Sequence, residues 1–461
     1  MKHFKRITAL AVGAVLTSSV MLFGACTPTE GPAEDPVDEA VYTLVAKTNA
    51  CSLLVGDETY ASAATSFLAK KDGETVEAPE ITYTVADPSI AEVNADGVVT
   101  SKAYGKTEIV ATYKSATARV PVYVYERTTA ENVNSFDERY VNRYGRQYFT
   151  DGKLNVDHVS SGIEVAFLGD SLTVDVDVTN DREGSTVFDV YVHVYIDGDT
   201  KGEFKVLTQG EYTLAEGLGE GIHTVRMLKA SEIDRGKFTV NSFDAEEFLR
   251  IPEKSDLKME FIGDSITAGY GNIAVRKDGV MPGWSVDNSD SCVAYATLTA
   301  QKLNADFSVI ALSGICLKAQ KYGPMTMVEM HTYVSNRTKE VYTYDADMDV
   351  VVLALGTNDA GYILDDGHTD YRSQFPKDYA AFLRHLRSIY PDAYVVCIYG
   401  MMGTRTPVDE GIKKALEEVN DAKMSYKTFT KNDAGAVGHP NAKAHIAYAD
   451  QLTAYIQELI G

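Results

Sequence analysis

The chain after residue 252 alternates between short apolar segments and longer segments with one polar face. Apolar segments of strand length lie at 257–262, 307–312, 350–355 and 394–398. Segments of helix length lie at about 293–304, 377–390, 411–420 and 441–460. Alternating strands and helices predict a parallel sheet that is covered by helices on both faces. In such sheets the functional residues lie beyond the carboxyl ends of the strands.

Residues 127–252 follow a different pattern, in which apolar and polar positions alternate one by one. Every second residue is apolar over 172–178, and the same holds over 188–196. A strict period of two predicts strands with one solvated face. We therefore expect a jelly-roll β-sandwich over 127–252.

Residues 41–126 contain short β patterns separated by Gly, Pro and Asp. Three segments, DPSIAEVN at 87–94, DGVV at 96–99 and YGKT at 104–107, resemble the bacterial Ig-like domain. This resemblance implies an Ig-like β-sandwich over 41–126 that serves as a spacer. Within it, residues 118–124 alternate as a strand at the edge of a sheet would. Three regions fit the domain count expected for 461 residues.

The N-terminus has the layout of an export signal. Basic residues at positions 2, 5 and 6 precede an apolar stretch over 7–23, so we expect a signal peptide over 1–25. The following Cys26 stands after Gly24 and Ala25, an arrangement that resembles a bacterial lipobox and implies lipidation of Cys26. Residues 26–40 are acidic and Pro-rich and predict an extended linker. The alternative is an ordinary secretory peptide that is cleaved nearby.

The net charge, the apolar segments and the cysteines limit the kinds of molecule that the protein is expected to bind. The net charge of −23 would repel phosphate backbones, which excludes nucleic acid as an expected partner. After the signal region no apolar segment reaches the ~18 residues of a membrane span, so a lipid at Cys26 is the expected membrane contact. Four further cysteines show no zinc-ligand spacing. Cys397 is expected in the core. The sequence does not decide whether Cys292 and Cys316 form a disulfide.

Three polar motifs each follow one of the first three predicted strands, and a fourth polar motif lies near the C-terminus. They are GDSIT at 263–267, SG at 313–314, GTND at 356–359 and GHPN at 438–441. A serine at a glycine-flanked strand exit is accessible, as a nucleophile must be. Together the motifs resemble the SGNH (GDS-type) hydrolases from about residue 257 to 461. The resemblance implies a flavodoxin-like α/β hydrolase domain over 253–461.

The same resemblance assigns roles to individual residues. Ser265 corresponds to the nucleophile and His439 to the general base. The backbone N–H groups of Ser265 and Gly314 and the side chain of Asn358 correspond to the oxyanion hole. His445, inside the final predicted helix, is the alternative base, but His439 lies in a loop before a proline and is better placed to reach a nucleophile.

Two further features set limits on this assignment. A second GDS sequence ends at Ser171, but it opens an alternating strand and lacks partner motifs, so we interpret it as a turn. SGNH enzymes commonly carry Asp three residues before the His, where this chain has Ala436. Asp433 is the candidate third member of a triad. Otherwise a backbone carbonyl orients His439, which leaves a Ser–His dyad.

The sandwich and the hydrolase region together resemble carbohydrate esterase family two. The shared features are Gly145-Arg146, the GIHTV segment at 221–225 with Lys229 and Glu232, and the motifs around Ser265 and Gly314. The resemblance implies a serine esterase that removes acetyl groups from carbohydrate. The sequence has no cluster of His and carboxylates at metal-ligand spacing and no G-x-G-x-x-G or P-loop motif, so neither a cofactor nor a metal is expected. Trp284, the only tryptophan, is the candidate sugar-binding residue, with loop anchoring as the alternative. The rival functions are another SGNH acyl-ester hydrolase or acyltransferase, such as a lipase or thioesterase, and a glycan-binding protein with an inert hydrolase domain.

Overall fold

The structure is a computed structural model that describes residues 40–127, 132–133, 137–180, 189–320 and 325–461. Residues 42–461 form one compact unit. The predicted signal peptide, Cys26 and nearly all of the predicted linker lie outside the described residues. Among the helices of the described ranges, none is both long enough and apolar enough to cross a membrane.

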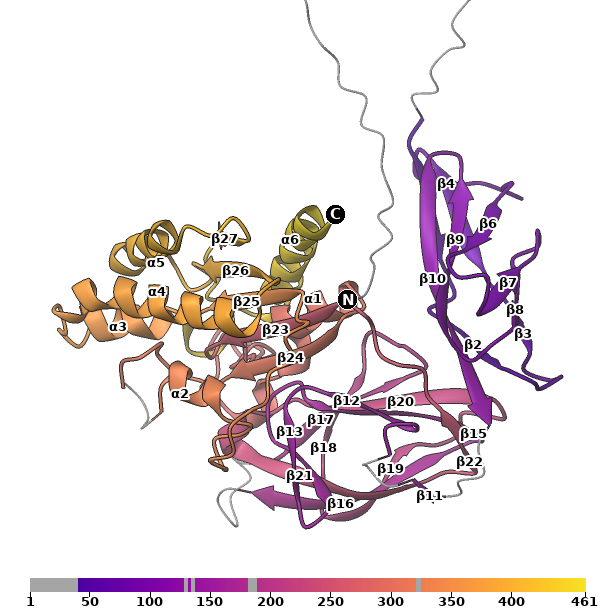
Figure 1. The fold of residues 1–461 in the computed structure, drawn as a ribbon, viewed down its shortest axis with the longest axis horizontal. Coiled ribbons are helices and arrows are strands. Elements are labelled where there is room, and N and C mark those ends of the chain that lie inside the picture. The colour runs from indigo at the N-terminus through magenta and orange to yellow at the C-terminus, as the bar shows by residue number, and fades with distance from the viewer. Residues whose placement is uncertain (1–39, 128–131, 134–136, 181–188, 321–324) are drawn as a thin grey trace, which may run out of the picture. The chain divides into compact units, whose positions relative to one another are not determined.

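The C-terminal region contains a parallel sheet of five strands (Figure 1). Its strands are β23 (Lys258–Gly263), β24 (Asp306–Ala311), β25 (Val350–Ala354), β26 (Tyr394–Tyr399) and β27 (Met424–Thr428). Their spatial order is β24-β23-β25-β26-β27, which is the flavodoxin-like order. The register aligns Gly263 with Ala311 on one side and with Ala354 on the other. The segments that follow these three strands therefore emerge at one edge of the sheet.

Helices cover both faces of this sheet because its strands are apolar on both faces. The helices are α1 (Tyr295–Lys302), α2 (Met327–Thr332), α3 (Thr357–Leu364), α4 (Tyr371–Ile389), α5 (Thr406–Val419) and α6 (Ala442–Ile460). Alternate strand residues pack on different sides, so that Val352 joins the core with α1 and α6, whereas Val351 joins the core with α2 to α5. The predicted parallel sheet and its two helix layers are confirmed.

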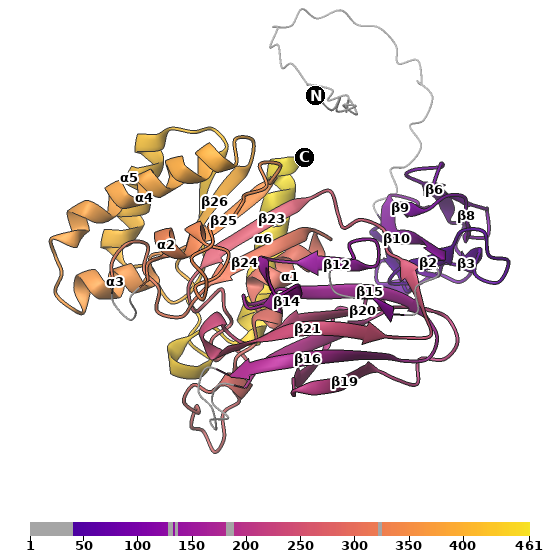
Figure 2. The same cartoon turned by 60° about the horizontal axis from the view of Figure 1, so that its bottom comes forward.

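The middle region is a sandwich of two antiparallel sheets (Figure 2). One sheet holds β11 (Asn132–Val133), β13 (Gln147–Thr150), β14 (Lys153–Val156), β16 (Leu172–Asn180), β19 (Gly210–Ala215) and β21 (Gly236–Asp244). The other holds β12 (Val141–Tyr144), β15 (Gly162–Leu168), β17 (Tyr191–Ile196), β18 (Glu203–Val206), β20 (Ile222–Lys229) and β22 (Glu247–Arg250). Inward residues such as Val174, Val194 and Phe238 form one apolar core. The alternation seen in the sequence therefore places one face of each sheet inside.

The N-terminal region contains the Ig-like strands. They are β1 (Tyr42–Ala46), β2 (Cys51–Leu54), β3 (Ser62–Ala64), β4 (Phe67–Lys71), β5 (Glu74–Thr75), β6 (Thr82–Val85), β7 (Ala91–Val93), β8 (Val98–Ser101), β9 (Gly105–Tyr113) and β10 (Ala116–Arg127). The prediction that 118–124 lie at a sheet edge holds for 118–121, whose pairing is with β9, but not for 122–124, which pair with β9 on one side and with β2 on the other. At its end, β10 also pairs with β22 and so continues into the sandwich sheet.

Candidate active site

Ser265 lies just beyond the end of β23, in the turn that leads away from the sheet. Its neighbour Asp264 holds the turn, since the Asp264 carboxylate accepts the backbone N–H of Ile266 at 3.0 Å. Ser265 is only 6% exposed. The Asp264 carboxyl is itself buried, and burial raises its pKa to about 7. Asp264 therefore serves as a structural hydrogen-bond acceptor in the turn that carries Ser265.

His439 reaches Ser265 from the other end of the hydrolase region. Nε2 of His439 lies 2.9 Å from Oγ of Ser265, a hydrogen-bond distance. The residue follows the short turn Ala436–Gly438, in which Val437 has the left-handed backbone φ of 51°. Burial lowers the pKa of His439, while the backbone of Ala436 and Val437 acts in the opposite direction. The imidazole is thus favoured in the neutral form that a general base requires.

The proposed oxyanion-hole residues follow the strands on either side of β23. Gly314 comes after β24 and has a φ of 80°, a backbone conformation that favours glycine. Asn358 lies in the first turn of α3, directly after β25, and its Nδ2 donates to the carbonyl of Ile315 at 3.0 Å. Because the three strands end in register, Ser265, Gly314 and Asn358 share one edge of the sheet with His439.

Asp433, the candidate third triad member, lies on the surface. Its carboxylate pairs with Nζ of Lys431 at 2.9 Å and its side chain is 62% exposed. The described residues provide no hydrogen bond between Asp433 and His439. Ala436, three residues before the histidine, is fully buried against Gly271 and donates its N–H to the Gly271 carbonyl at 2.9 Å. Within the described residues, Nδ1 of His439 is buried and forms no hydrogen bond, so no carboxylate orients the imidazole in this structure.

The alternative base, His445, and the serine of the second GDS sequence, Ser171, lie away from Ser265. His445 is buried in α6, and its Nδ1 accepts the backbone N–H of Tyr295 at 3.1 Å. Burial lowers the pKa of His445 to about 3, so it is a neutral hydrogen-bond acceptor in the core. Ser171 is exposed and immediately precedes β16, while Asp170 accepts the backbone N–H groups of Gly217 and Gly219. The interpretation of the second GDS sequence as a turn is confirmed.

Trp284 belongs to a row of rings that leads to His439. Its ring stacks on Tyr270 with centroids 5.4 Å apart, and the Tyr270 ring lies 4.5 Å from that of His439. The guanidinium of Arg235, from the sandwich, lies 4.4 Å from the Trp284 centroid. Trp284 is half-buried. Contacts within the protein thus anchor its loop, and part of the ring stays accessible beside the site.

The cysteines and possible metal ligands can be placed as well. Cys51, Cys292, Cys316 and Cys397 are buried thiols, so the part of the chain that the structure describes contains no Cys292–Cys316 disulfide. Cys397 lies in the core on β26, as predicted. Within the same described ranges, no group of three or more His, Cys, Asp or Glu side chains is arranged to hold a metal ion.

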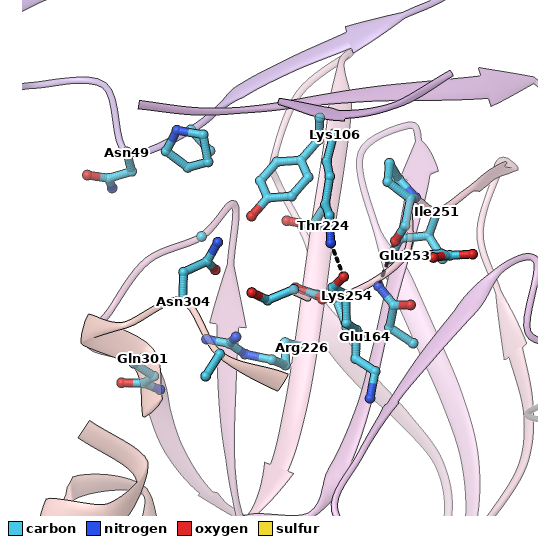
Figure 3. Close-up of a pocket in the computed structure, with 18 of the residues that line it drawn as sticks. Asn49, Lys106, Glu164, Thr224, Arg226, Ile251, Glu253, Lys254, Gln301 and Asn304 are labelled. Atoms are coloured by element: carbon cyan, nitrogen blue, oxygen red, sulfur yellow. Dashed lines mark hydrogen bonds between the residues drawn. The ribbon is translucent and has the colours of Figure 1, made fainter. Parts of the chain in front are cut away.

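A cavity of about 450 Å³ lies apart from these residues (Figure 3). Its lining includes Asn49 and Lys106 from the Ig-like strands, Glu164 and Arg226 from the sandwich, and Asn304 after α1. Neither Ser265 nor any other predicted site residue lines it.

Two residues beside the site carried no assigned role in the sequence. Tyr270 follows the GDS motif by five positions, and its place next to His439 depends on how the loop folds. Glu232 comes from the sandwich and is 2% exposed. Its carboxylate accepts both the backbone N–H and the Oγ–H of Ser313, each at 2.7 Å. No local sequence signal indicates this contact, because the two residues are 81 positions apart.

Three family models match successive parts of the chain. The Bacterial Ig-like domain (group 2) matches residues 49–124. The Carbohydrate esterase 2 N-terminal model matches residues 144–252. The GDSL-like Lipase/Acylhydrolase family matches residues 261–445, the range that contains Ser265 and His439.

The chain is also similar in sequence and structure to proteins that are named as esterases or deacetylases. The Cellulase/esterase CelE of Acetivibrio thermocellus is 31% identical over 318 residues, which are 65% of this chain but only 37% of that protein. The Acetylxylan esterase / glucomannan deacetylase of Cellvibrio japonicus is 26% identical over 65% of this chain and 84% of its own length. The solved family two carbohydrate esterase from Clostridium thermocellum, in complex with cellohexaose, covers 70% of this chain and 99% of its own, with a TM-score of 0.62 and 27% identity. The chain therefore carries, in succession, regions that match a bacterial Ig-like domain, the N-terminal domain of carbohydrate esterase 2 and the GDSL-like lipase/acylhydrolase family.

Proposed function

We propose that this protein is a serine esterase that removes O-acetyl groups from carbohydrate. The observation that carries the proposal is the 2.9 Å contact between His439 Nε2 and Ser265 Oγ, at the sheet edge that also presents Gly314 and Asn358. The names of the similar proteins support an acetylated polysaccharide, such as xylan or glucomannan, as the substrate class.

In the proposed reaction, Oγ of Ser265 attacks the acetyl carbonyl while Nε2 of His439 takes the Oγ proton. The new Oγ–C bond gives a tetrahedral intermediate with a negatively charged oxygen. The N–H groups of Ser265 and Gly314 and the side chain of Asn358 donate to that oxygen, and each such donor typically lowers the barrier by roughly 3–4 kcal/mol. His439 then protonates the departing sugar oxygen as the C–O bond breaks. Water, activated by the same imidazole, releases acetate from Ser265.

His439 acts in this scheme as part of a dyad. For Nε2 to accept a proton, the neutral ring must carry its own proton on Nδ1. Asp433 is paired with Lys431 at the surface, and Nδ1 of His439 forms no hydrogen bond within the described residues. The backbone of Ala436 and Val437 raises the pKa of the ring against the effect of burial. We therefore assign the orienting role to this backbone rather than to a carboxylate.

The nucleophile is tested by two matched serine variants. Ser265→Ala should abolish hydrolysis of p-nitrophenyl acetate and labelling by a fluorophosphonate probe. Ser171→Ala serves as the control, because its serine has the same local sequence but lies before β16, and it should retain both activities. Loss of labelling in the Ser171 variant alone would overturn the assignment. Wild-type protein that neither labels nor hydrolyses would favour the glycan-binding alternative.

The acyl preference is tested with a chain-length series. The loop over 271–291 has Trp284 as its one aromatic residue, and its exposed apolar side chains Val275 and Val280 stand among charged residues and glycines. Since a buried methylene contributes roughly 0.8 kcal/mol, a lipase should improve steadily from acetate to octanoate. We expect kcat/KM to fall along p-nitrophenyl acetate, butyrate and octanoate, and acetate to be released from acetylated xylan, mannan or glucan. The opposite trend without acetate release would favour another acyl ester.

Two finer assignments accompany this function. Trp284 is assigned to sugar stacking, because its ring is partly exposed and the row of rings through Tyr270 ends at His439. A Trp284→Ala variant should then raise KM for polysaccharide more than KM for p-nitrophenyl acetate. Cys26 is assigned as a lipidated N-terminus of an exported protein. Incorporation of labelled palmitate that is lost in Cys26→Ser would support this assignment, and equal incorporation would contradict it.

A further inference from the structure

The contact between Glu232 and Ser313 joins the sandwich to the loop after β24. Glu232 stands at the start of the short turn Ile233–Arg235, which follows β20. Its two carboxylate oxygens are used separately, because Oε2 accepts the Ser313 N–H and Oε1 accepts the Ser313 Oγ–H, each at 2.7 Å. Ser313 is therefore fixed by both its backbone and its side chain.

The turn that carries Glu232 is itself held in place. Nζ of Lys229 donates to the carbonyls of Ser231 and Glu232, at 2.6 and 2.8 Å. The side chain of Lys229 is fully buried, so these bonds are shielded from water. The carboxylate thus projects from a rigid support, and rigid support is what a precisely placed hydrogen-bond partner needs.

Ser313 directly precedes Gly314, whose N–H is assigned to the oxyanion hole. The Gly314 N–H lies in the planar peptide that joins Ser313 to Gly314, so its direction follows the backbone conformation of Ser313. Donors of an oxyanion hole work because they are aimed before the charge develops. A misplacement of about 1 Å can cost on the order of 10²-fold in rate.

We propose that Glu232 is a positioning residue for the reaction at Ser265, which it serves by holding Ser313 so that the Gly314 N–H points at the oxyanion. This inference rests on the proposed function. It gives the carbohydrate esterase 2 N-terminal domain a direct part in the chemistry of the hydrolase domain.

The surroundings of Glu232 make this contact sensitive to pH. Burial raises the pKa of Glu232 to about 7, and the negative charge of Asp234 adds to this effect, whereas Arg235 and the bonds from Ser313 act against it. The other charged or titratable groups that interact with it are Lys229, Asp264 and Tyr270. The ionised carboxylate accepts both hydrogen bonds from Ser313, one on each oxygen. In the protonated carboxyl one oxygen carries the proton, so only the other oxygen accepts a hydrogen bond as before. The positioning should therefore weaken as pH falls through about 7.

The test uses three variants and p-nitrophenyl acetate. Glu232→Ala removes both bonds and should lower kcat by roughly 10- to 100-fold, part of the loss that follows removal of a whole oxyanion donor, while KM changes less than about threefold. Glu232→Gln can accept the N–H and donate to Oγ, so at pH 8 its kcat should stay within about threefold of wild type. Its rate should also lose the ionisation near pH 7, which moves the acid limb to lower pH.

Ser313→Ala completes a double-mutant cycle with Glu232→Ala. Ser313→Ala removes only the Oγ–H bond, and Glu232→Ala already removes that bond together with the N–H bond. The double variant should therefore be no slower than Glu232→Ala within about threefold. Glu216→Ala is the matched control, since Glu216 is an exposed glutamate of the same sandwich, and it should behave as wild type. If Glu232→Ala fails to fold, the pH profile of Glu232→Gln and the kcat of Ser313→Ala still decide the question.

Several outcomes would overturn the proposal. A folded Glu232→Ala with wild-type kcat would do so, as would additive losses in the cycle. So would a Glu232→Gln variant that is as slow as Glu232→Ala, because the contact would then not be the cause. Wild-type protein that neither hydrolyses the ester nor reacts with a fluorophosphonate would instead contradict the proposed function on which the inference rests.

Discussion

His439 is the residue whose environment most directly sets the proposed chemistry. Its ring is largely withdrawn from water yet contacts Ser265, and burial lowers its pKa from an ordinary value of 6.5. The protonated form cannot accept the serine proton. The contribution of His439 to the rate therefore rises with pH as the ring loses its proton, and this contribution levels off at a pH below that of a solvent-exposed histidine.

This behaviour gives a prediction for the pH profile. In Glu232→Gln, where the ionisation of Glu232 no longer contributes, kcat/KM for p-nitrophenyl acetate should be half-maximal below pH 6.5. Below that midpoint it should fall about tenfold per pH unit. A midpoint clearly above pH 6.5 would mean that a negative charge, rather than burial, dominates the surroundings of the imidazole.

Asp433 provides a second prediction for a single residue. Its carboxylate is exposed and paired with Lys431, and such surface pairs contribute little to either stability or catalysis. Asp433→Asn should thus change kcat by less than about tenfold, whereas loss of a true triad aspartate typically costs ~10⁴. A thousandfold loss in a folded variant would show that Asp433 orients His439 during the reaction.

Among the elements, the loop after Ser265 packs against the turn that presents His439. Gly271 has a φ of 61°, and a Cβ at this position would lie 2.5 Å from Cβ of Ala436. Ala436, three residues before His439, is fully buried in this contact. The space that an aspartate side chain would need is occupied by the Gly271 loop.

The Gly271 loop is tested by adding one methyl group. Gly271→Ala should displace the Ala436–Gly438 turn and lower kcat by at least about tenfold, since a shift of 1 Å can cost ~10². Gly283→Ala, in the same loop, is the control, because a Cβ there meets no atom within 4 Å. Its kcat should stay within about twofold of wild type. Equal activities for the two variants would show that the His439 turn does not depend on this packing.

For the molecule as a whole, buried charges join the sandwich to the hydrolase sheet. Arg146, next to β13, donates to Glu260 of β23 at 2.8 Å, and Glu260 also lies 2.8 Å from Nε2 of His331. Both side chains of the Arg146–Glu260 pair are fully buried. The positive groups hold the pKa of Glu260 well below its usual range, so the carboxylate stays charged. The two domains therefore share a core rather than a flexible junction.

This network predicts a large loss of stability on removal of one partner. Arg146→Ala leaves Glu260 charged and only partly compensated, and it should lower the free energy of unfolding by about 3–5 kcal/mol. Arg139→Ala breaks an exposed pair with Asp137 and should cost less than about 1 kcal/mol. Urea denaturation of both variants measures the difference. Similar losses would indicate that the buried pair does not lock the domains.

The sequence by itself determined the architecture of the domains, and it predicted the pairing of Ser265 with His439 that the structure places 2.9 Å apart. Apolar runs and strict alternation are local properties of the chain, so they located β23, β24, β25, β26 and β16 to within a residue or two. The GDS and GHPN motifs marked Ser265 and His439 for the same reason. The short strand β27 escaped prediction, because its residues are only partly buried and carry no continuous apolar run.

The tertiary structure decided what depends on residues that are distant along the chain. Whether Asp433 reaches His439, which rings surround Trp284, and whether Cys292 meets Cys316 are all set by how loops pack. The same holds for Glu232, whose partner Ser313 is 81 positions away. Hydrophobic patterning specifies which face of an element is buried but not which side chains meet across an interface. Which side chains form a contact across an interface depends on how the elements pack in three dimensions.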